Sequence, residues 1–520
     1  MNLLAALKPR GLPPGPDGKP PSGPPPLTWP ITLGLAGTVL SAFASYLATR
    51  LTSFAAVDLT GGFGIGTDEA SWVANAYNVG EIVVVPMTAW LGGIISQRRA
   101  IAIAMAVLTV ASAACPVAPS YTWLIALRFI EGLGGGALIP LLLSTLLRFI
   151  PLHQRVIAFA FYALVTTSTP LVAEFVTGLL TELLGWQAVF YAVVLLCPVV
   201  MILVLAGLPV EPVKSEGFTG ADYPGMMLMA LFAGTLTTAL DVGQRLDWFD
   251  DPLILALFAA SGCLLVAFVA WELSTPKPLI NLRLLGRRNL ACGLVLIFPF
   301  SMSLVATSTV VSQYGTLVRG FRELQVGEVL IWAALIQAAV CALGPPVLRR
   351  VDTRVAIACG LVLVALGCRF ATYIDSDWAI LNLIPSQTLI ACGQPLVMMG
   401  LLFTTTSVLQ PQDGVSGATL FNVVRTLAGS VGGAIVTGVM TVRERVHSNT
   451  MVDHLVSGAL PTMQGGGTAA LAGAVRVQAT VMATADAYGM IGVVMVATML
   501  MLFVTTEVRI AKSPVAKAPA

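Results

Sequence analysis

The sequence predicts an all-α polytopic membrane protein with fourteen transmembrane helices in a 6+2+6 arrangement. Fourteen long apolar stretches run from Ile31 almost to the C-terminus, and a bilayer core needs roughly 20 apolar residues per helix. Hydrophobic residues make up 57% of the 520 residues and charged residues 10%, against about 25% charged in a typical soluble domain. A soluble core cannot hide that much apolar surface, and short loops leave no room for a separate soluble catalytic domain.

The apolar stretches define the expected spans in chain order. Each is long enough to cross a bilayer as a helix, because a helix rises about 1.5 Å per residue. Polar or basic segments separate them. The expected spans are 31–55, 72–95, 100–118, 122–147, 156–182, 188–210, 225–243, 252–273, 289–313, 327–348, 355–374, 378–407, 416–441 and 486–508.

These spans divide the chain into five regions. The Pro/Gly-rich segment 1–30 lacks the apolar core of a signal peptide and is predicted to be a disordered cytoplasmic tail. Two six-helix bundles are expected over 31–210 and 289–508. Between them, 211–288 is a linker that carries the two inserted helices, and 509–520 is a second cytoplasmic tail.

The distribution of basic residues predicts the orientation. With the N-terminus inside, eighteen Lys and Arg residues lie on the cytoplasmic side and six on the outer side, which is the bias of an N-in, C-in protein. Spans 13 and 14 are separated by a long outer loop, 442–485. The arginine pairs in LGGIISQRR (91–99) and LGPPVLRRVDTR (343–354) suggest that the bundles are internal repeats, although basic turns also occur in polytopic proteins without repeats. Repeats place a substrate site near the midplane between halves.

Ionisable side chains within the spans are the strongest functional signal, because charge inside a bilayer is costly. Arg50, Glu81, Arg128 and Glu174 lie in four different spans, all roughly 7–14 Å below the outer surface. Glu131 shares a span with Arg128. We infer one buried network of alternating sign that faces an internal cavity.

Such a network fits proton coupling, because burial raises the pKa of a carboxyl group and a nearby guanidinium lowers it again. A carboxylate that gains or loses an arginine partner can load and release a proton. The titrating candidates are Glu81, Glu131 and Glu174, and the tuning candidates are Arg50 and Arg128. Two alternatives stay open: Arg50 and Arg369 could snorkel to the interface, and Glu81 and Glu174 could form purely structural ion pairs.

Four segments resemble the fourteen-span EmrB/QacA-type drug:proton antiporters of the major facilitator superfamily. LRFIEGLGGGALIP (127–140) is similar to the R-x-x-Q-G-x-G pattern of their helix 4, with Arg128 in place and Glu131 where Gln is common. The other three are the loop GQRLDWFDDP (243–252), the linker PLINLRLLGRRNL (278–290) and the helix 13 segment FNVVRTLAGSVGGAI (421–435).

The resemblance implies a major facilitator fold whose two bundles rock between inward-open and outward-open states. It also implies that Arg128 takes part in proton coupling. The residues expected to line the substrate cavity are Asn75, Asn78, Gln387, Asn422 and Arg425. Small residues let helices approach closely, and those expected to do so here are Gly132, Gly134, Gly136 and Gly178.

The function implied is a proton-coupled efflux transporter of small amphiphilic or toxic compounds in a bacterial inner membrane. The segment 442–485 matches EmrB-like members, which implies a periplasmic adaptor protein and an outer-membrane channel as partners. No enzyme, cofactor, metal or nucleic acid is expected, because GxSxG, HExxH and paired His/Asp patterns do not occur. An uptake symporter of an organic anion is the alternative, since fold does not fix direction.

Two departures from the family pattern affect the site. The helix 1 segment ASYLATRL (44–51) lacks the usual acid and has Arg50, while AEFVTG (173–178) keeps only Gly178 of the helix 5 motif. One interpretation relocates the titrating carboxylate to Glu174 or Glu81. Glu174→Gln and Arg128→Ala are then each expected to abolish efflux. The other is a substrate of anionic or weak-acid character, which intramembrane arginines would suit; these are Arg50, Arg369 and Arg425.

Overall fold

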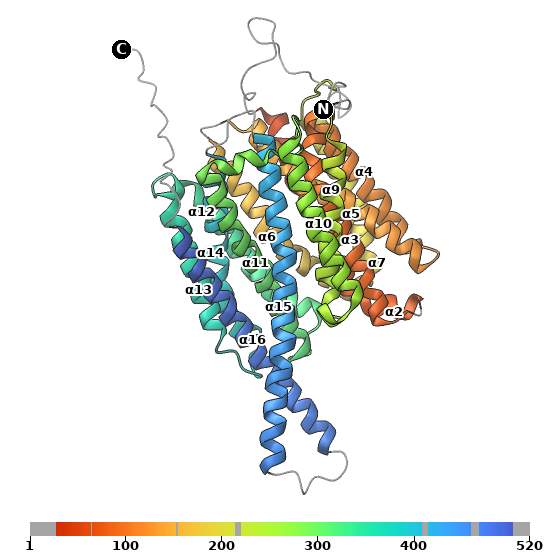
Figure 1. The fold of residues 1–520 in the computed structure, drawn as a ribbon, viewed down its shortest axis with the longest axis vertical. Helices are drawn as coiled ribbons and strands as arrows, with labels where there is room; N and C mark the ends of the chain where they lie inside the picture. Colours follow the sequence, from red (N-terminus) through yellow and green to blue (C-terminus); the bar gives the residue numbers. More distant parts are fainter. Residues whose placement is uncertain are drawn as a thin grey trace, which may run out of the picture.

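The protein is a bundle of long helices joined by short connections (Figure 1). Residues 1–27 and 509–520 of the two predicted tails lie outside the part of the chain that the structure describes. The residues described by this computed structural model are 28–63, 65–151, 154–213, 220–407, 414–458 and 467–502.

Six helices of the N-terminal half pack together on one side of the molecule (Figure 1). Within the described residues they are α2 (Trp29–Phe63), α3 (Thr67–Ile95), α4 (Gln97–Ala114), α5 (Tyr121–Phe149), α6 (Arg155–Leu184) and α7 (Gln187–Gly207).

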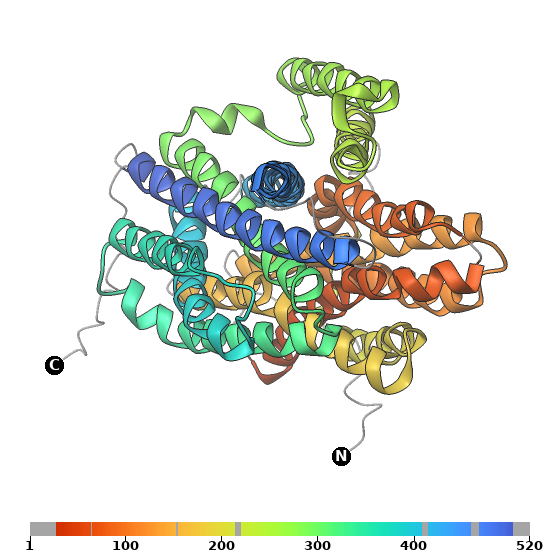
Figure 2. The same ribbon diagram turned by 90° about the horizontal axis from the view of Figure 1, so that it is seen from below.

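Six helices of the C-terminal half form the other side, and Figure 2 shows the two groups from below. The described residues place them at α11 (Arg288–Leu317), α12 (Glu323–Leu348), α13 (Thr353–Ala371), α14 (Ile380–Thr406), α15 (Gly414–Gly458) and α16 (Gly467–Met501).

The two inserted helices form a pair beside the N-terminal half (Figure 2). They are α9 (Tyr223–Gly243) and α10 (Pro252–Ser274), and α9 packs on α3. Among the described residues, thirteen helices are long and apolar enough to cross a membrane. The remaining long helix is α3, which carries two asparagines and Glu81. The predicted all-α, fourteen-span fold is confirmed.

Local sequence signals start several of these helices. The Ser120 side chain caps α5 by accepting the backbone N–H of Trp123, and Asp222 caps α9 by accepting that of Gly225. Asp251 and Asp352 act in the same way at α10 and α13. Each cap satisfies one N–H of the first helical turn, which has no partner within the helix.

The predicted outer loop 442–485 is not a loop in the described residues, because α15 continues to Gly458 and α16 begins at Gly467. The two extensions project beyond the other helices (Figure 1). Arg443 Nε and His447 Nε2 of α15 lie 2.5 and 2.8 Å from the Asp486 carboxylate of α16. The prediction was wrong because hydropathy marks where the apolar stretch ends, whereas a helix continues until its backbone is interrupted.

Candidate functional site

A cavity of about 500 Å³ lies between the two halves, within the size range of small-molecule sites. Its walls come from α2, α3 and α6 of the first half and from α11, α12, α14 and α15 of the second, with one further wall from α9. The lining contains both apolar and polar side chains. The charged and amide side chains in it are Arg50, Asn75, Asn78, Glu81, Asp241, Gln244, Gln337, Gln387, Gln394 and Arg425.

Glu81 is the carboxylate of α3 that reaches the cavity from the first half. Arg425, on α15, and Arg50, on α2, line the same cavity, and their positive charges act on the Glu81 carboxylate. Its backbone is held against α5, where a Cβ on Gly136 would collide with the Glu81 main chain. The close approach at Gly136 therefore positions this acid in the cavity wall, where it has one cationic neighbour from each half.

Glu174 forms a separate ion pair beside the cavity. Arg50 Nε lies 3.2 Å from Glu174 Oε2, and the Ser312 hydroxyl donates to Glu174 Oε1 at 3.3 Å. The Glu174 side chain is 6% exposed and is not part of the cavity lining. Because Arg50, Glu174 and Ser312 belong to α2, α6 and α11, this cluster connects the two halves.

Arg128 and Glu131 form a second ion pair that is sealed from solvent. Arg128 Nη1 lies 2.6 Å from Glu131 Oε2, and both side chains are 0% exposed. The Ser112 hydroxyl donates to Glu131 at 2.5 Å, and Arg128 donates to the Ala48 carbonyl at 3.2 Å. The guanidinium also lies 4.5 Å from the centre of the Tyr77 ring. All of these partners of the Arg128–Glu131 pair belong to the first half.

The prediction of one continuous network facing the cavity is therefore wrong. Glu81, Arg50 and Arg425 line the cavity, whereas Arg128 and Glu131 do not. Residues at one depth can point in different directions around their helices, because successive helical positions are rotated by about 100°. Tyr77, one turn before Glu81, covers the Arg128 side of α3 and donates its hydroxyl to the Ser45 carbonyl.

Of the five predicted cavity residues, Asn422 is placed elsewhere. Asn75, Asn78, Gln387 and Arg425 line the cavity. The Asn422 carbonyl instead accepts the Tyr162 hydroxyl at 2.6 Å, and its amide donates to the Ala418 carbonyl on the preceding turn. It lies one turn before Arg425 on α15 and outside the cavity lining.

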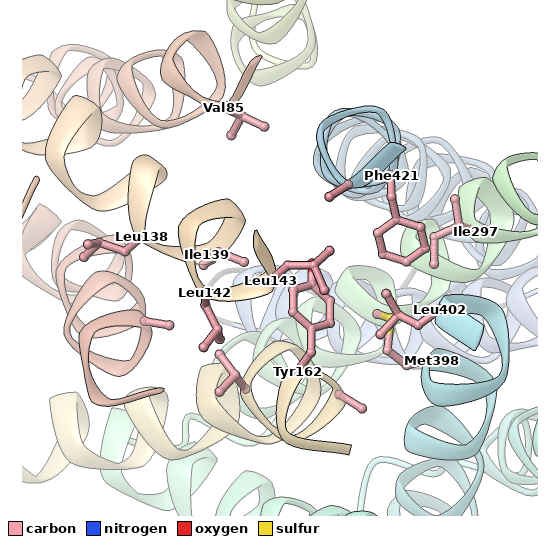
Figure 3. Packing of buried hydrophobic residues seen from close by; sticks show 14 of the residues in the cluster. Val85, Leu138, Ile139, Leu142, Leu143, Tyr162, Ile297, Met398, Leu402 and Phe421 are labelled. Carbon is pink, nitrogen blue, oxygen red and sulfur yellow. The ribbon is translucent and has the colours of Figure 1, made fainter. Parts of the chain in front are cut away.

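The hydrogen bond from Tyr162 to Asn422 joins the two halves, and Figure 3 shows Tyr162 among buried apolar side chains from both of them. The Tyr162 ring packs edge-on against Phe421, with centroids 6.3 Å apart, and Phe159 packs in the same way against Phe403. We call this the tyrosine layer. Its other buried apolar members include Leu143, Ile297, Met398 and Leu402.

Residues missed by sequence reasoning also line the cavity. Gln337 donates to the Gln394 carbonyl at 2.8 Å, and Gln394 donates to Thr307 at 3.1 Å, so the second half presents a chain of amides and hydroxyls. Asp241 lies near the end of an inserted helix, a place typical of interfacial residues. Gln394 follows the predicted Gln387 by two helical turns on one face, and that spacing could have indicated it. The neighbours of α9 could not be read from its sequence.

The predicted packing glycines lie where helices approach closely. A Cβ on Gly132 would meet the Tyr77 carbonyl, one on Gly134 would meet Leu108 N at 2.7 Å, and one on Gly178 would meet Glu323 C at 2.9 Å.

Gly136→Ala is expected to lower the free energy of unfolding by about 1–3 kcal/mol, because α3 must shift away from α5.

The measurement is the apparent melting temperature of the purified protein in detergent. Gly262→Ala is the matched control, because a Cβ there has no atom within 4 Å and alanine is the better helix former by about 1 kcal/mol. Equal melting temperatures for the two variants would show that the close α3–α5 approach contributes nothing.

Comparisons with known proteins agree with this architecture. Residues 38–433 match the model of the Major Facilitator Superfamily. The chain is 26% identical over 432 residues to the multidrug export protein EmrB of Haemophilus influenzae, which covers 82% of this chain and 83% of that protein. It is 27% identical over 443 residues to the fatty acid resistance protein FarB of Neisseria gonorrhoeae, which covers 82% and 84%.

A solved structure of the human organic anion transporter MFSD10 has the same fold. Its TM-score is 0.57 at 12% sequence identity, and the match covers 91% of this chain and 98% of that one. The family match spans well over half of the sequence and includes both halves of the helical bundle. The chain therefore belongs to the major facilitator superfamily of multi-pass membrane transporters, and it is not an enzyme.

Proposed function

We propose that this protein exports small amphiphilic compounds by alternating access, driven by the proton gradient. The observation that supports this most is the position of Glu81, a carboxylate in the cavity wall that faces Arg50 of its own half and Arg425 of the other half. Rocking of the halves changes the distance between Glu81 and Arg425. Because proton affinity depends on such nearby charges, opening and closing of the cavity would load and release a proton.

The orientation we propose has both termini in the cytoplasm and the protein in a bacterial inner membrane. The tyrosine layer then lies on the cytoplasmic side, since Asn422 follows soon after the start of α15. The cavity residues of α2 and α3, such as Arg50 and Asn75, then lie toward the outer surface. In this orientation the structure corresponds to a state closed to the cytoplasm, with the tyrosine layer as the inner gate.

Tyr162→Phe is expected to open the tyrosine layer more often, by about tenfold in the equilibrium between closed and open states. The change removes the hydroxyl donor to Asn422 and leaves its buried carbonyl without that partner, which costs about 1–3 kcal/mol. Hydrogen–deuterium exchange should therefore rise at the start of α15 and at the end of α14. Tyr373→Phe, which alters an exposed hydroxyl that accepts from Arg369, is the control, and equal exchange in both variants would contradict the gate.

The direction of coupling separates export from the alternative, proton-coupled uptake of an organic anion. In proteoliposomes with an acidic interior, an antiporter accumulates substrate as protons leave, whereas a symporter requires an alkaline interior. We expect accumulation of a fluorescent amphiphile only with the acidic interior, and its loss when nigericin collapses the pH gradient. Accumulation with the alkaline interior alone would establish the symporter instead.

The arginines that suggested an anionic substrate have different surroundings. Arg369 lies outside the cavity lining, where its guanidinium donates to the hydroxyls of Thr372 and Tyr373. Arg50 is paired with Glu174, which leaves Arg425 as the arginine of the three that could meet a substrate anion. An anionic substrate thus remains a prediction that depends on Arg425.

We also propose that the projecting ends of α15 and α16 contact a periplasmic adaptor protein that leads to an outer-membrane channel. In the proposed orientation these ends lie on the outer side of the membrane, and the α15 extension exposes Val442 and Val446. A photo-crosslinking residue at exposed Thr450 is expected to capture such an adaptor in host cells. Capture at an inner loop position such as Arg350, but not at Thr450, would contradict this docking site.

A further inference from the structure

Two buried carboxylates meet at the end of the inserted helix pair where α9 begins and α10 ends. Asp222, which caps α9, is 7% exposed, and Glu272, in the last turn of α10, is 2% exposed. Both acids point at one place, because a Cβ on Gly225 would lie 2.7 Å from Glu272 Oε1 and would also strike Asp222 Oδ2. The two side chains lie within hydrogen-bonding reach of each other. We call them the acid pair, and they lie outside the cavity lining.

No cation compensates the acid pair in the part of the chain that the structure describes. Neither acid takes part in a salt bridge there. The titratable and charged groups on the adjoining segments are Tyr223 of α9 and the linker residues Lys277, Arg283, Arg287 and Arg288. Arg283 donates to the Leu273 carbonyl at 3.1 Å, and Tyr223 packs edge-on against Trp90. Two carboxylates that share a buried site without a counter-ion do not both ionise readily, so the pair tends to keep one proton.

The acid pair holds the linker that leads from α10 to the second half. The backbone N–H of Leu279 donates to Asp222 Oδ2 at 3.3 Å, and that of Ile280 donates to Glu272 Oε2 at 3.2 Å. Asp222 Oδ1 accepts the Trp271 indole N–H at 2.7 Å. The fourth oxygen, Glu272 Oε1, is buried and has no hydrogen-bond partner among the described residues. This oxygen is where a proton shared with Asp222 would reside.

We propose that Asp222 and Glu272 share one proton and act as a pH-sensitive latch that fastens the linker to the inserted helices. With the proton bound, Glu272 Oε1 donates to Asp222 Oδ2, and the pair carries a single negative charge that the two linker N–H groups stabilise. When the proton passes to water, two negative charges remain in contact. Their repulsion favours a state in which the linker separates and water reaches both acids. The latch is therefore fastened at low pH and released as the pH rises.

Release of the latch would loosen the tie between the two halves. The inserted pair packs on α3 of the first half, whereas the linker continues into α11, the first helix of the second half. The acid pair would thus set how freely the halves move at a given pH. This inference goes beyond the proposed export and depends on neither substrate nor direction. In the proposed orientation the latch lies on the cytoplasmic side, where it would respond to the pH of the cell interior.

Hydrogen–deuterium exchange of the full-length purified protein at a series of pH values tests the latch. The relevant amides are those of Leu279 and Ile280, and their exchange is corrected for the intrinsic pH dependence of the chemistry. Opening that releases one proton becomes about tenfold more frequent per pH unit. We therefore expect the corrected exchange of this segment in the wild type to rise by about that factor per unit in the range where the latch loses its proton.

Three variants separate the shared proton from mere packing. Glu272→Gln keeps a donor for Asp222 and an acceptor for the Ile280 N–H but cannot titrate, so its segment should stay protected at every pH. Glu272→Ala removes both groups and should exchange about tenfold faster than the wild type even at low pH. Asp250→Asn is the matched control, because it removes an exposed acid at the opposite end of the inserted pair, and it should follow the wild type.

Infrared difference spectra of wild type and Glu272→Gln detect the proton directly, since a protonated carboxyl has a C=O stretch that a carboxylate lacks. We expect a wild-type band that fades as the pH rises. Three results would overturn the proposal: exchange in the wild type that does not change with pH, exchange in Glu272→Gln that rises as in the wild type, and protection that follows sodium or potassium concentration at constant pH, which would indicate a bound cation instead. Failure of the exporter proposal would change none of these measurements, because no transport is involved.

Discussion

Arg128→Ala is expected to lower the free energy of unfolding by about 3–5 kcal/mol and to abolish transport. The reason is that Arg128 and its partner Glu131 are both 0% exposed. The variant leaves the Glu131 carboxylate in an apolar interior without its cation. Removal of one partner of a buried ion pair costs about 3–5 kcal/mol of stability. The sequence alone predicted only the loss of efflux. The structure adds a loss of stability.

Thermal unfolding in detergent and transport in proteoliposomes measure the two effects. Replacing both partners, by Arg128→Met with Glu131→Met, should recover most of the stability, since a buried ion pair can be exchanged for apolar groups at little cost. If that double variant is stable but fails to transport, the pair has a role in coupling beyond folding. Arg369→Ala controls for loss of an arginine at an exposed position, and a melting temperature for Arg128→Ala equal to that of this control would contradict the buried pair.

The sequence predicted the number, order and approximate position of the helices because hydropathy directly reports which segments a bilayer can hold. It also identified Arg50, Glu81 and Arg425 as charged residues within spans, and these three do share the cavity. What it could not provide was the direction of each side chain around its helix axis. That direction separates Glu81, in the cavity, from Glu131, in a sealed pair.

Contacts between segments far apart in the chain also could not be predicted from the sequence. Asn422 lies one turn before Arg425, and nothing in that spacing reveals that Tyr162 of α6, 260 residues away, holds it in a closed layer. The hydrogen bond of Asp241 could not be predicted for the same reason, because its partner Asn78 lies 163 residues earlier. Local sequence fixes the helix, but tertiary packing decides which side chains meet.

Glu81→Gln is expected to uncouple transport from the proton gradient while leaving the protein folded. Each coupled proton contributes about 1.4 kcal/mol per pH unit, or tenfold accumulation. A gradient of about two units therefore drives roughly hundredfold accumulation in the wild type at one proton per substrate, and none in the variant. Glutamine keeps the size and hydrogen-bonding capacity of Glu81 but cannot release a proton. Because Glu81 is only partly buried, the change should be tolerated structurally.

Exchange of substrate across the membrane without a gradient distinguishes uncoupling from inactivity. Exchange requires binding and rocking but no net proton movement, so Glu81→Gln should retain it. Glu174→Gln is the informative comparison, because Glu174 is paired with Arg50 outside the cavity lining and should lose stability more than coupling. If Glu174→Gln instead abolishes accumulation while Glu81→Gln accumulates like wild type, the titrating carboxylate is Glu174, and proton loading must then occur where α2, α6 and α11 meet rather than in the substrate cavity.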